Sequence, residues 1–474
     1  MRIKLGMPIA LSELRESIGL NILPPLLTDV TLSQDGFSTD IPSSSENSIT
    51  IEHISTDSRE VRKGDLFISL ADGEDTSDGH INEARLLGAY ALRSRPSVND
   101  ELTPLEKIAS HYREMLGKIK VIVAITGSTG KTTTKAFANA LLSTRYITHA
   151  TNGNFNNEIG VPLTILGAPP HTEALILEMG MNKFGEISRL SRTARPTICA
   201  ITNIGSAHIG NLGSKQAIAK AKLEIIDGIL DGGILISRFA DRLNINSARN
   251  ISKCTYSYDL NNEGSCLFPA DGGNYRFIID GHCVSLSFFS DTTQILEDLA
   301  LALSIAYYSG VDIKRLPGAV ADINEDMLRF TVSEIGGITI IDDAYNSSTE
   351  SVSAALAELT KQKARNRSAL VGDILEAGEF SEQIHYNLGR MLADSVDKLY
   401  LVGEMSEMIK SGATSAGLAE RSIFIIEKSD NISSIVRAVH SLVDKGECIL
   451  IKASHGVGLY KFKEEYERLI NDAK

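Results

Sequence analysis

The chain has 474 residues, of which 43% are hydrophobic and 23% are charged, and its formal net charge is −13. This length and composition predict a globular protein of about three domains of ~150 residues each. The net negative charge argues against nucleic acid or an anionic membrane surface as a partner. No apolar run reaches the length of a membrane helix, and charges interrupt the N-terminal run too early for a signal peptide. We therefore expect a cytoplasmic protein with no membrane span.

The first part of the chain predicts a small α/β domain over residues 1–117. Leucine and isoleucine residues at helical spacing predict a short helix within residues 1–20. Residues 21–48 are rich in Pro, Ser, Asp and Asn, which predicts a long loop. A helix expected at 105–116 would close this domain.

A strand expected to start at residue 49 leads into the run Ser-Thr-Asp-Ser-Arg, which ends with Ser58 and Arg59. A second apolar strand is expected at 66–70. Hydroxyl groups and an arginine at the end of a strand suit a phosphate or a nucleotide diphosphate. The same residues could equally form a hydrogen-bonded turn without a ligand, so this run by itself leaves both interpretations open.

A glycine-rich turn follows the β-branched run 121–126, which predicts a strand buried on both faces. An Ala-rich helix is expected next, from about residue 133 to residue 143. Backbone N–H groups of such a turn close around a polyphosphate, and the helix dipole adds positive potential. Lys131 would reach the terminal phosphates, and the Thr132 hydroxyl would bind Mg²⁺. The turn consists of Gly127, Ser128, Thr129, Gly130, Lys131, Thr132 and Thr133.

The signature of this turn is T-G-x-x-G-K-T-T, which is narrower than the common G-x-x-x-x-G-K-[ST] pattern. The common pattern would require glycine at position 125, which is Ile125. A glycine turn that merely links a strand to a helix is the alternative, but it would not need Lys-Thr at the start of the helix.

Two further strands of the central region end in polar side chains. The strand expected at 174–178 ends on Glu178, and the strand at 197–202 precedes a loop that contains His208. Ligands of open α/β sheets bind beyond the carboxyl ends of the strands, so both side chains should converge on the glycine turn. Thr132 and Glu178 offer the hard oxygen ligands that Mg²⁺ prefers. His208 is a softer ligand, and a hydrogen-bonded loop histidine is the alternative for it.

The helix predicted at 214–230 carries a lysine on its apolar face. Lys222 lies within a stripe of isoleucine and alanine residues, whereas Lys220, Glu224 and Asp227 lie on the opposite face. A lysine in this position must extend to solvent, pair, lose its proton or be modified. A neutral amine can react with CO₂ to form a carbamate, which binds a metal as a carboxylate does. Without further information, extension to solvent is the favoured interpretation.

The rest of the chain predicts a β-rich segment at 250–290, a helix at 295–308 and a domain end near residue 317. From 318 to 474, strands and helices alternate again, which predicts a doubly wound unit. Its first strand, at 338–341, is followed by polar side chains that could meet a base or a ribose, or cap a helix. These side chains include Asp343, Tyr345 and Asn346.

Taken together, several motifs resemble those of the Mur ligase family, and the resemblance covers most of the chain. The pair formed by EMGMN-x-x-GEI and TNIG-x-AH is similar to the branch of that family that adds a dipeptide. The motifs are STDSR at 55–59, ITGSTGKTTT at 125–134, GNFNNEIGVPLTIL at 153–166, EMGMNKFGEI at 178–187, TNIGSAHIGNLGS at 202–214, IAKAKLEI at 218–225, DDAYN at 342–346 and GDILEAG at 372–378.

The resemblance implies a three-domain α/β fold and an ATP-dependent amide-bond ligase of peptidoglycan precursor synthesis. A UDP-sugar-binding domain would span 1–117, a P-loop-type parallel-sheet ATPase domain 118–317, and a Rossmann-like domain 318–474. The substrates implied are UDP-N-acetylmuramoyl-tripeptide and D-alanyl-D-alanine, which would be joined through an acyl phosphate. Two Mg²⁺ ions are implied as cofactors, and the protein is expected to be a monomer.

The resemblance also implies roles for individual residues. Thr132 and Glu178 would bind the first Mg²⁺, and His208 and a carbamylated Lys222 would bind the second, which makes the carbamate the favoured interpretation of Lys222. Lys131 would act on the phosphates. Other residues implied at the nucleotide are Asp298, Arg329, Asp343, Tyr345 and Asn346; those implied at the acceptor substrate are Asn154 and Asn157, with Ser58 and Arg59 at the uridine diphosphate.

Several positions depart from the family pattern, among them residues 91–104, the run Asn346-Ser347-Ser348-Thr349, Asp298 and His455. Asp298 stands where the family has an asparagine that contacts the nucleotide, and His455 stands where it has an arginine. These departures motivate one rival interpretation, a non-catalytic relative that binds a nucleotide sugar. A second rival is a sibling ligase that adds a single amino acid, against which the EMGMN motif counts.

Overall fold

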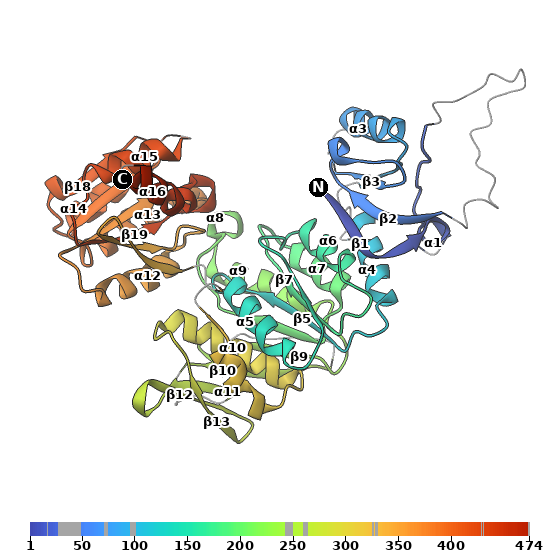
Figure 1. Ribbon diagram of the computed structural model, residues 1–474, viewed down its shortest axis with the longest axis horizontal. Helices are drawn as coiled ribbons and strands as arrows, with labels where there is room; N and C mark the ends of the chain where they lie inside the picture. Colours follow the sequence, from blue (N-terminus) through green and yellow to red (C-terminus); the bar gives the residue numbers. More distant parts are fainter. Residues whose placement is uncertain are drawn as a thin grey trace, which may run out of the picture.

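The computed structural model contains three β-sheets, each with its own helices, and the nine-stranded sheet lies between the other two (Figure 1). Within the described part of the chain, no helix is long and apolar enough to cross a membrane. The structure describes residues 1–16, 18–26, 49–70, 74–94, 101–241, 250–258, 264–324, 327, 330–427, 429 and 431–472.

The first sheet has the strand order β1-β2-β3-β4, with β1 antiparallel to β2 and the other pairs parallel. Its elements are β1 (Arg2–Ala10), α1 (Leu11–Glu16), β2 (Thr50–Ser55), β3 (Leu66–Ser69), α3 (Glu74–Leu86) and β4 (Tyr90–Arg93). The helix predicted within 1–20 is therefore wrong for its first half, because residues 2–10 pair with β2. The helical spacing of the leucines holds only for the short α1, where Leu11 and Leu14 are buried. Most of the loop predicted at 21–48 lies outside the described residues.

The nine-stranded sheet has the order β13-β12-β11-β10-β9-β8-β5-β7-β6, and all of its pairs are parallel except β11–β12 and β12–β13. Its strands are β5 (Val121–Thr126), β6 (Thr148–Ala150), β7 (Ala174–Glu178), β8 (Ile198–Ile201), β9 (Ile234–Arg238), β10 (Ser252–Ser257), β11 (Ser265–Pro269), β12 (Asn274–Ile279) and β13 (His282–Ser287).

Helices cover both faces of this sheet. They are α4 (Pro104–Met115), α5 (Lys131–Ser143), α6 (Gly160–Leu166), α7 (Glu186–Ala194), α8 (Ile209–Leu212), α9 (Lys215–Leu223), α10 (Thr293–Tyr308) and α11 (Leu316–Ala321). Along β5, Ile122 and Ala124 pack with α6 and α7, whereas Val123 and Ile125 pack with α5 and α10. Because both faces of the strand are buried, its sequence is a continuous apolar run in which apolar and polar residues do not alternate.

The helix predicted at 214–230 is shorter than expected. It ends at Leu223 and continues as a 3-10 turn over Glu224–Ile226. The carboxylate of Glu224 accepts hydrogen bonds from the backbone N–H of Gly185, at 3.0 and 2.9 Å, just before α7 begins. This long-range contact, which the helical pattern does not encode, lies where the regular helix ends.

The third sheet has the order β14-β15-β19-β16-β17-β18, and only the β14–β15 pair is antiparallel. Its strands are β14 (Thr331–Ile335), β15 (Ile338–Asp342), β16 (Asn366–Gly372), β17 (Lys398–Val402), β18 (Ile423–Ile426) and β19 (Glu447–Lys452). Its helices are α12 (Thr349–Lys361), α13 (Ser381–Ala393), α14 (Ser406–Ser415), α15 (Ile432–His440) and α16 (Phe462–Asp472). The predicted doubly wound unit is confirmed, although the sequence analysis did not identify β14, α14 or α16.

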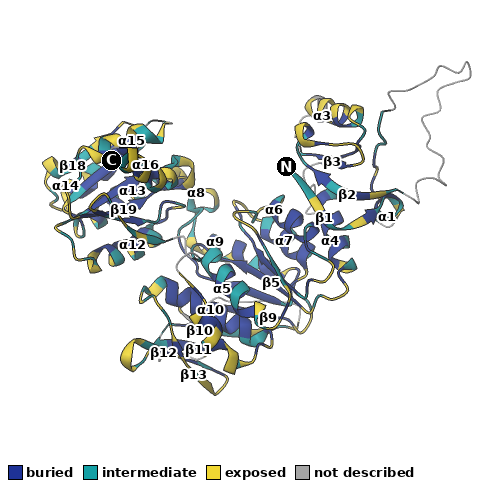
Figure 2. Cartoon of the chain, in the orientation of Figure 1, coloured by how far each residue is buried: buried dark blue, intermediate teal, exposed yellow. Residues whose placement is uncertain are grey.

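The residues buried around each sheet form its core, drawn in dark blue in Figure 2, and exposed residues gather on the outer helices. The helix α4 leads from the first sheet to the second, where the Tyr112 hydroxyl donates to the carbonyl of Ala168 at 2.6 Å. The third sheet meets the second near α8, where the backbone N–H of Gly210 donates to the carbonyl of Glu376 at 3.1 Å. The carboxyl ends of the central strands thus lie next to the C-terminal part of the chain.

Candidate active site

The glycine turn lies between β5 and α5, as predicted, and two of its glycines have positive φ angles, 151° at Gly127 and 77° at Gly130. A Cβ on Gly127 would lie 1.7 Å from the Thr202 hydroxyl oxygen, and one on Gly130 would lie 2.0 Å from a carboxyl oxygen of Asp298. Only glycine therefore fits at either position. The ammonium group of Lys131 donates to the carbonyl of Gly127 at 2.8 Å, which keeps it over the turn.

The carboxylate of Glu178 lies against the start of α5 and is 1% exposed. Its Oε2 atom accepts a hydrogen bond from the Thr132 hydroxyl at 2.9 Å and lies 3.3 Å from Nζ of Lys135. Its Oε1 atom accepts from the side-chain amide of Asn156 at 2.9 Å. Burial acts to raise the pKa of Glu178, but the charges of Lys135 and Lys131, together with the hydrogen bonds from Asn156 and Thr132, make the net shift downward. Glu178 is thus held as a carboxylate beside the glycine turn, which is the predicted phosphate loop.

The sequence analysis missed two of these partners. It selected Asn154 and Asn157 but not Asn156, and it did not single out Lys135. The side chain of Asn157 instead accepts from the backbone N–H of Gly160 at 2.8 Å, which caps the start of α6. Helical spacing gave a signal for Lys135, because it lies one turn after Lys131 on α5 and therefore shares its face.

His208 follows β8 in the left-handed backbone region, with φ of 67°. Its Nδ1 atom lies 2.6 Å from Oε2 of Glu376, which belongs to the segment after β16. The hydrogen bond with His208 is the main cause that lowers the pKa of Glu376. The loop histidine is therefore paired across the junction between the second and third sheets.

Lys222 is 1% exposed, so the structure excludes the alternative in which its side chain extends to solvent. Burial, with a smaller contribution from the charge of Lys131, lowers the pKa of Lys222 well below its ordinary value. Within the described residues, no hydrogen bond or ion pair is recorded for its amine. A buried amine that favours its neutral form meets the chemical requirement for reaction with CO₂.

The C-terminal residues selected from the sequence face the phosphate loop. Asp343, Tyr345 and Asn346 line a cavity of about 210 Å³ together with the residues of the turn, Glu178 and Asp298. Lys452, which the sequence analysis did not select, is 1% exposed and lies 2.9 Å from a carboxyl oxygen of Asp343. It also donates to the carbonyl of Asn346 at 2.5 Å. This buried lysine fixes the loop that follows β15.

A second cavity, of about 380 Å³, adjoins the first, and residues of both sheets line it. Asn154, Asn157 and His208 contribute from the central part of the chain, and Tyr345 and His455 from the C-terminal part. The His455 ring stacks on Tyr460 with ring centres 4.5 Å apart and meets Tyr345 edge to face at 5.0 Å. Two adjoining cavities between the sheets provide room for a nucleotide beside a second substrate.

Asp298 lies at the phosphate loop, but it is nearly enclosed, with 2% of its surface exposed. Burial and the neighbouring charge of Glu297 raise the pKa of Asp298 well above its ordinary value. The side chain of Gln294 donates to its carboxyl at 3.3 Å. The position of Arg329, also selected from the sequence, lies outside the described residues.

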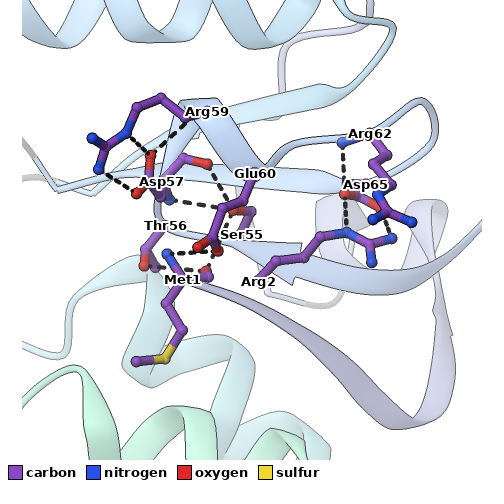
Figure 3. A network of polar contacts seen from close by, with 9 residues as sticks. All are labelled: Met1, Arg2, Ser55, Thr56, Asp57, Arg59, Glu60, Arg62 and Asp65. Carbon is purple, nitrogen blue, oxygen red and sulfur yellow. Dashed lines mark hydrogen bonds and ion pairs between the residues drawn. The ribbon is translucent and has the colours of Figure 1, made fainter.

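Ser58 and Arg59 belong to the short 3-10 turn Ser58–Glu60 that follows β2, and neither lines either cavity. The guanidinium of Arg59 faces the carboxylate of Asp57 (Figure 3). Ser58 is 7% exposed, whereas the side chain of Arg59 is 83% exposed. The guanidinium of Arg59 donates to both carboxyl oxygens of Asp57, at 2.8 and 2.6 Å, which lowers the pKa of Asp57. Arg59 thus presents a charged group to solvent while it pairs with Asp57.

The side-chain oxygens at the phosphate loop supply part of the coordination shell of a magnesium ion. Among the described residues, no group of three or more His, Cys, Asp and Glu side chains could hold a metal ion by itself. Mg²⁺ usually takes one or two protein oxygens and completes its shell with phosphates and waters. The Thr132 hydroxyl and the Glu178 carboxylate, 2.9 Å apart, supply such oxygens beside a phosphate site.

A phosphate loop at the edge of a parallel sheet, beside a second doubly wound sheet, defines a nucleotide-dependent enzyme whose site lies between two domains. The profile of the Mur ligase middle domain matches residues 125–286, and that of the Mur ligase glutamate ligase domain matches residues 328–455. The chain belongs to the Mur ligase family. It is an ATP-dependent peptide ligase. The names of its relatives indicate the branch of the family to which it is most similar.

Two relatives are named UDP-N-acetylmuramoyl-tripeptide–D-alanyl-D-alanine ligase. The one from Bacillus subtilis is 35% identical over 431 residues, which are 86% of this chain and 92% of the relative. The one from Synechocystis is 33% identical over 428 residues, with 87% and 91% covered. Among solved structures, MurF from Thermotoga maritima in complex with ADP has a TM-score of 0.70 at 29% identity and covers 89% of this chain and 98% of its own. MurF from Acinetobacter baumannii, at 23% identity, supports the fold with a TM-score of 0.79 and coverage of 98% and 100%.

Proposed function

We propose that the chain joins D-alanyl-D-alanine to UDP-N-acetylmuramoyl-tripeptide with hydrolysis of ATP to ADP and phosphate. The observation that carries the proposal is the buried Glu178 carboxylate bound to Thr132 at the start of α5, in a cavity that residues of the third sheet help to line. The relatives named above carry out the peptide-ligase step for which this arrangement is suited. The nucleotide would lie at the phosphate loop, and the second substrate would lie in the adjoining larger cavity.

The chemistry proceeds in two steps. A carboxylate oxygen of the tripeptide's last residue attacks the γ-phosphorus of ATP, ADP leaves, and an acyl phosphate forms. The amine of D-alanyl-D-alanine then attacks the acyl carbon, releases phosphate and loses a proton. Lys131 and the backbone N–H groups of the turn neutralise the charge that develops on the phosphoryl oxygens. Because water would hydrolyse the acyl phosphate, the C-terminal residues must close over the cavity.

Mg²⁺, when bound, would neutralise phosphate charge and orient the reacting groups. Thr132 and Glu178 would hold a first ion. His208 and a carbamylated Lys222 would hold a second, for which the burial of Lys222 is the supporting observation. For His208 to take this role, its Nδ1 partner Glu376 must move away or the ring must use Nε2.

The three parts of the chain divide the work. Residues 1–117 bind the uridine diphosphate through Ser58 and Arg59, residues 118–317 bind ATP, and residues 318–474 close on the nucleotide. The side chains proposed to contact the nucleotide are Asp298, Arg329, Asp343, Tyr345 and Asn346, and those at the acceptor are Asn154 and Asn157. Because one chain supplies all of these groups, we propose that it works as a monomer in the cytoplasm.

The test is phosphate release with purified protein, ATP and Mg²⁺. Release should require both UDP-N-acetylmuramoyl-tripeptide and D-alanyl-D-alanine, and mass spectrometry should detect the pentapeptide product. Release with a single amino acid in place of the dipeptide would favour a sibling ligase. Nucleotide-sugar binding without any release would indicate a non-catalytic relative and would refute the proposal.

A further inference from the structure

The ammonium group of Lys135 contacts the carboxylate of the proposed metal ligand Glu178 and the carbonyl of Gly153, at 3.3 and 3.4 Å. We infer that Lys135, together with Asn156, is a positioning residue that keeps the Glu178 carboxylate aimed at the phosphate loop when Mg²⁺ enters. This inference rests on the proposed role of Glu178 as a ligand of Mg²⁺.

The carboxylate of Glu178 is held from three sides. Lys135 and Thr132 both contact Oε2, at 3.3 and 2.9 Å, and Asn156 donates to Oε1 at 2.9 Å. If Thr132 and Glu178 ligate the same ion, each oxygen can give one lone pair to the ion while the hydroxyl still donates to the carboxylate. Lys135 and Asn156 are the side chains that orient the carboxylate from outside this pair of ligands. Outer partners of this kind fix the direction of metal-binding carboxylates.

Lys135 also connects the carboxylate to the segment between β6 and α6. Its Nζ atom donates to the carbonyl of Gly153 at 3.4 Å. The same segment carries Asn156, whose carbonyl accepts from the backbone N–H of Gly180 at 2.7 Å. A Cβ on Gly180 would lie 3.1 Å from the side-chain oxygen of Asn156, so this glycine leaves space for the amide. One lysine therefore ties together α5, the end of β7 and the asparagine-rich segment.

The charge balance explains why a lysine is needed there. A buried carboxylate such as Glu178 requires a nearby cation, and the two lysines of α5 supply it. When ATP binds, Lys131 turns from the carbonyls of its own turn to the phosphates. Lys135 is only 8% exposed at its side chain and is held by Gly153, so it keeps its place and remains the internal counter-ion of Glu178.

The test compares Lys135→Met with the wild type in Mg²⁺-dependent binding of a fluorescent ATP analogue, which needs no turnover. Loss of an outer partner should raise the Mg²⁺ concentration for half-maximal binding about 10- to 100-fold. Hydrogen exchange of backbone amides in residues 151–159 should become faster as well. An unchanged or lower Mg²⁺ requirement would overturn the inference, because repulsion between the ammonium and the ion would then be the dominant effect.

Two further variants complete the test. Asn156→Ala removes the contact with the other oxygen of the same carboxylate and should shift the Mg²⁺ requirement in the same direction, even if Lys135→Met does not fold. Lys120→Met is the matched control, because Lys120 is 59% exposed and pairs with Glu173 away from the site. It should leave both readouts at wild-type values.

Glu178→Gln separates this inference from the proposed function. If Glu178→Gln leaves the Mg²⁺ requirement unchanged, Glu178 is not a ligand and the proposed metal site fails. If Glu178→Gln raises the requirement but Lys135→Met does not, only the positioning role fails. In the double variant, Lys135→Met should add little, since a carboxamide carries no charge for the lysine to orient.

Discussion

His208 and Glu376 face each other across the junction of the second and third sheets, with Nδ1 of the histidine 2.6 Å from Oε2 of the glutamate. Both residues have positive φ angles, 67° and 61°, although neither is a glycine. Such backbone conformations are costly for side-chain-bearing residues and persist where surrounding contacts hold them. Here the backbone hydrogen bond from Gly210 to Glu376 provides one such contact. The pair therefore marks the place where the C-terminal part docks on the central part.

Gly210→Ala should disturb this docking. A Cβ on Gly210 would lie 2.4 Å from the carbonyl oxygen of Glu376 and 2.4 Å from the backbone nitrogen of Gly378, and backbone atoms cannot move aside individually. We expect a larger radius of gyration by small-angle X-ray scattering and a lower kcat. Gly318→Ala is the control, because a Cβ there meets nothing within 4 Å. Identical scattering curves for Gly210→Ala and the wild type would contradict a close junction.

Lys131→Ala should abolish most of the ligase activity without unfolding the protein. The ammonium group donates to the carbonyls of Gly127 and Ser128 within its own turn, at 2.8 and 3.3 Å, so its loss should leave the packing of the sheet and its helices intact. Loss of a preorganised charge donor typically removes ~3–4 kcal/mol of transition-state stabilisation, which is about a 100- to 1,000-fold fall in kcat. Steady-state phosphate release gives the activity, and thermal unfolding checks the fold. Near-normal turnover would refute the role assigned to the glycine turn.

Lys222→Ala should lose most of the activity, and a small carboxylate such as acetate should restore part of it. The side chain is buried, so its removal leaves an internal space that acetate can enter. Lys222→Arg should not be rescued, because a permanent cation would fill the same space. Carbon-13 NMR of the wild type in labelled bicarbonate should detect a carbamate signal that Lys222→Ala lacks. Full activity of Lys222→Ala without acetate would contradict the carbamate.

Asp298→Asn should stabilise the protein at neutral and higher pH. Because the pKa of Asp298 is raised in the folded chain, stability is full below the unfolded pKa of about 4 and is lost as the pH rises through the folded pKa. An amide of the same shape does not ionise, so it avoids this loss. Each kcal/mol recovered corresponds to a Tm increase of about 2–4 °C in a domain of this size.

Thermal unfolding at two pH values checks this expectation. The gain in Tm for Asp298→Asn should be larger at pH 8 than at pH 5, because the stability that goes with the raised pKa of Asp298 is lost progressively as the pH rises. Asp271→Asn, at an exposed position, should show no such difference. A Tm at pH 8 equal to or below that of the wild type would indicate that Asp298 is needed as a carboxylate.

Much of the central site was predictable because local sequence encodes it. The strand β5 has the predicted bounds, and the glycine turn follows it directly, since only glycine tolerates the positive φ angles and close approaches found there. The helical stripe around Lys222 predicted a lysine on the apolar side, and the structure confirms its burial. In each case, a few adjacent residues carry the whole physical constraint.

The partners of these residues depended on contacts between distant segments. Lys135 and Asn156 meet Glu178 because β5, which leads into α5, and β6, which leads into the asparagine-rich segment, both pair with β7. No local pattern distinguishes Asn156 from Asn157. The strand β1 likewise forms only when β2, about fifty residues later, supplies its hydrogen-bond partners. The sequence by itself therefore determined the strand, glycine turn and helix at the centre of the chain, and the alternation of strands and helices after residue 318. Only the tertiary structure decided which side chains hold the carboxylate in place, because burial and pairing arise when separate strands come together.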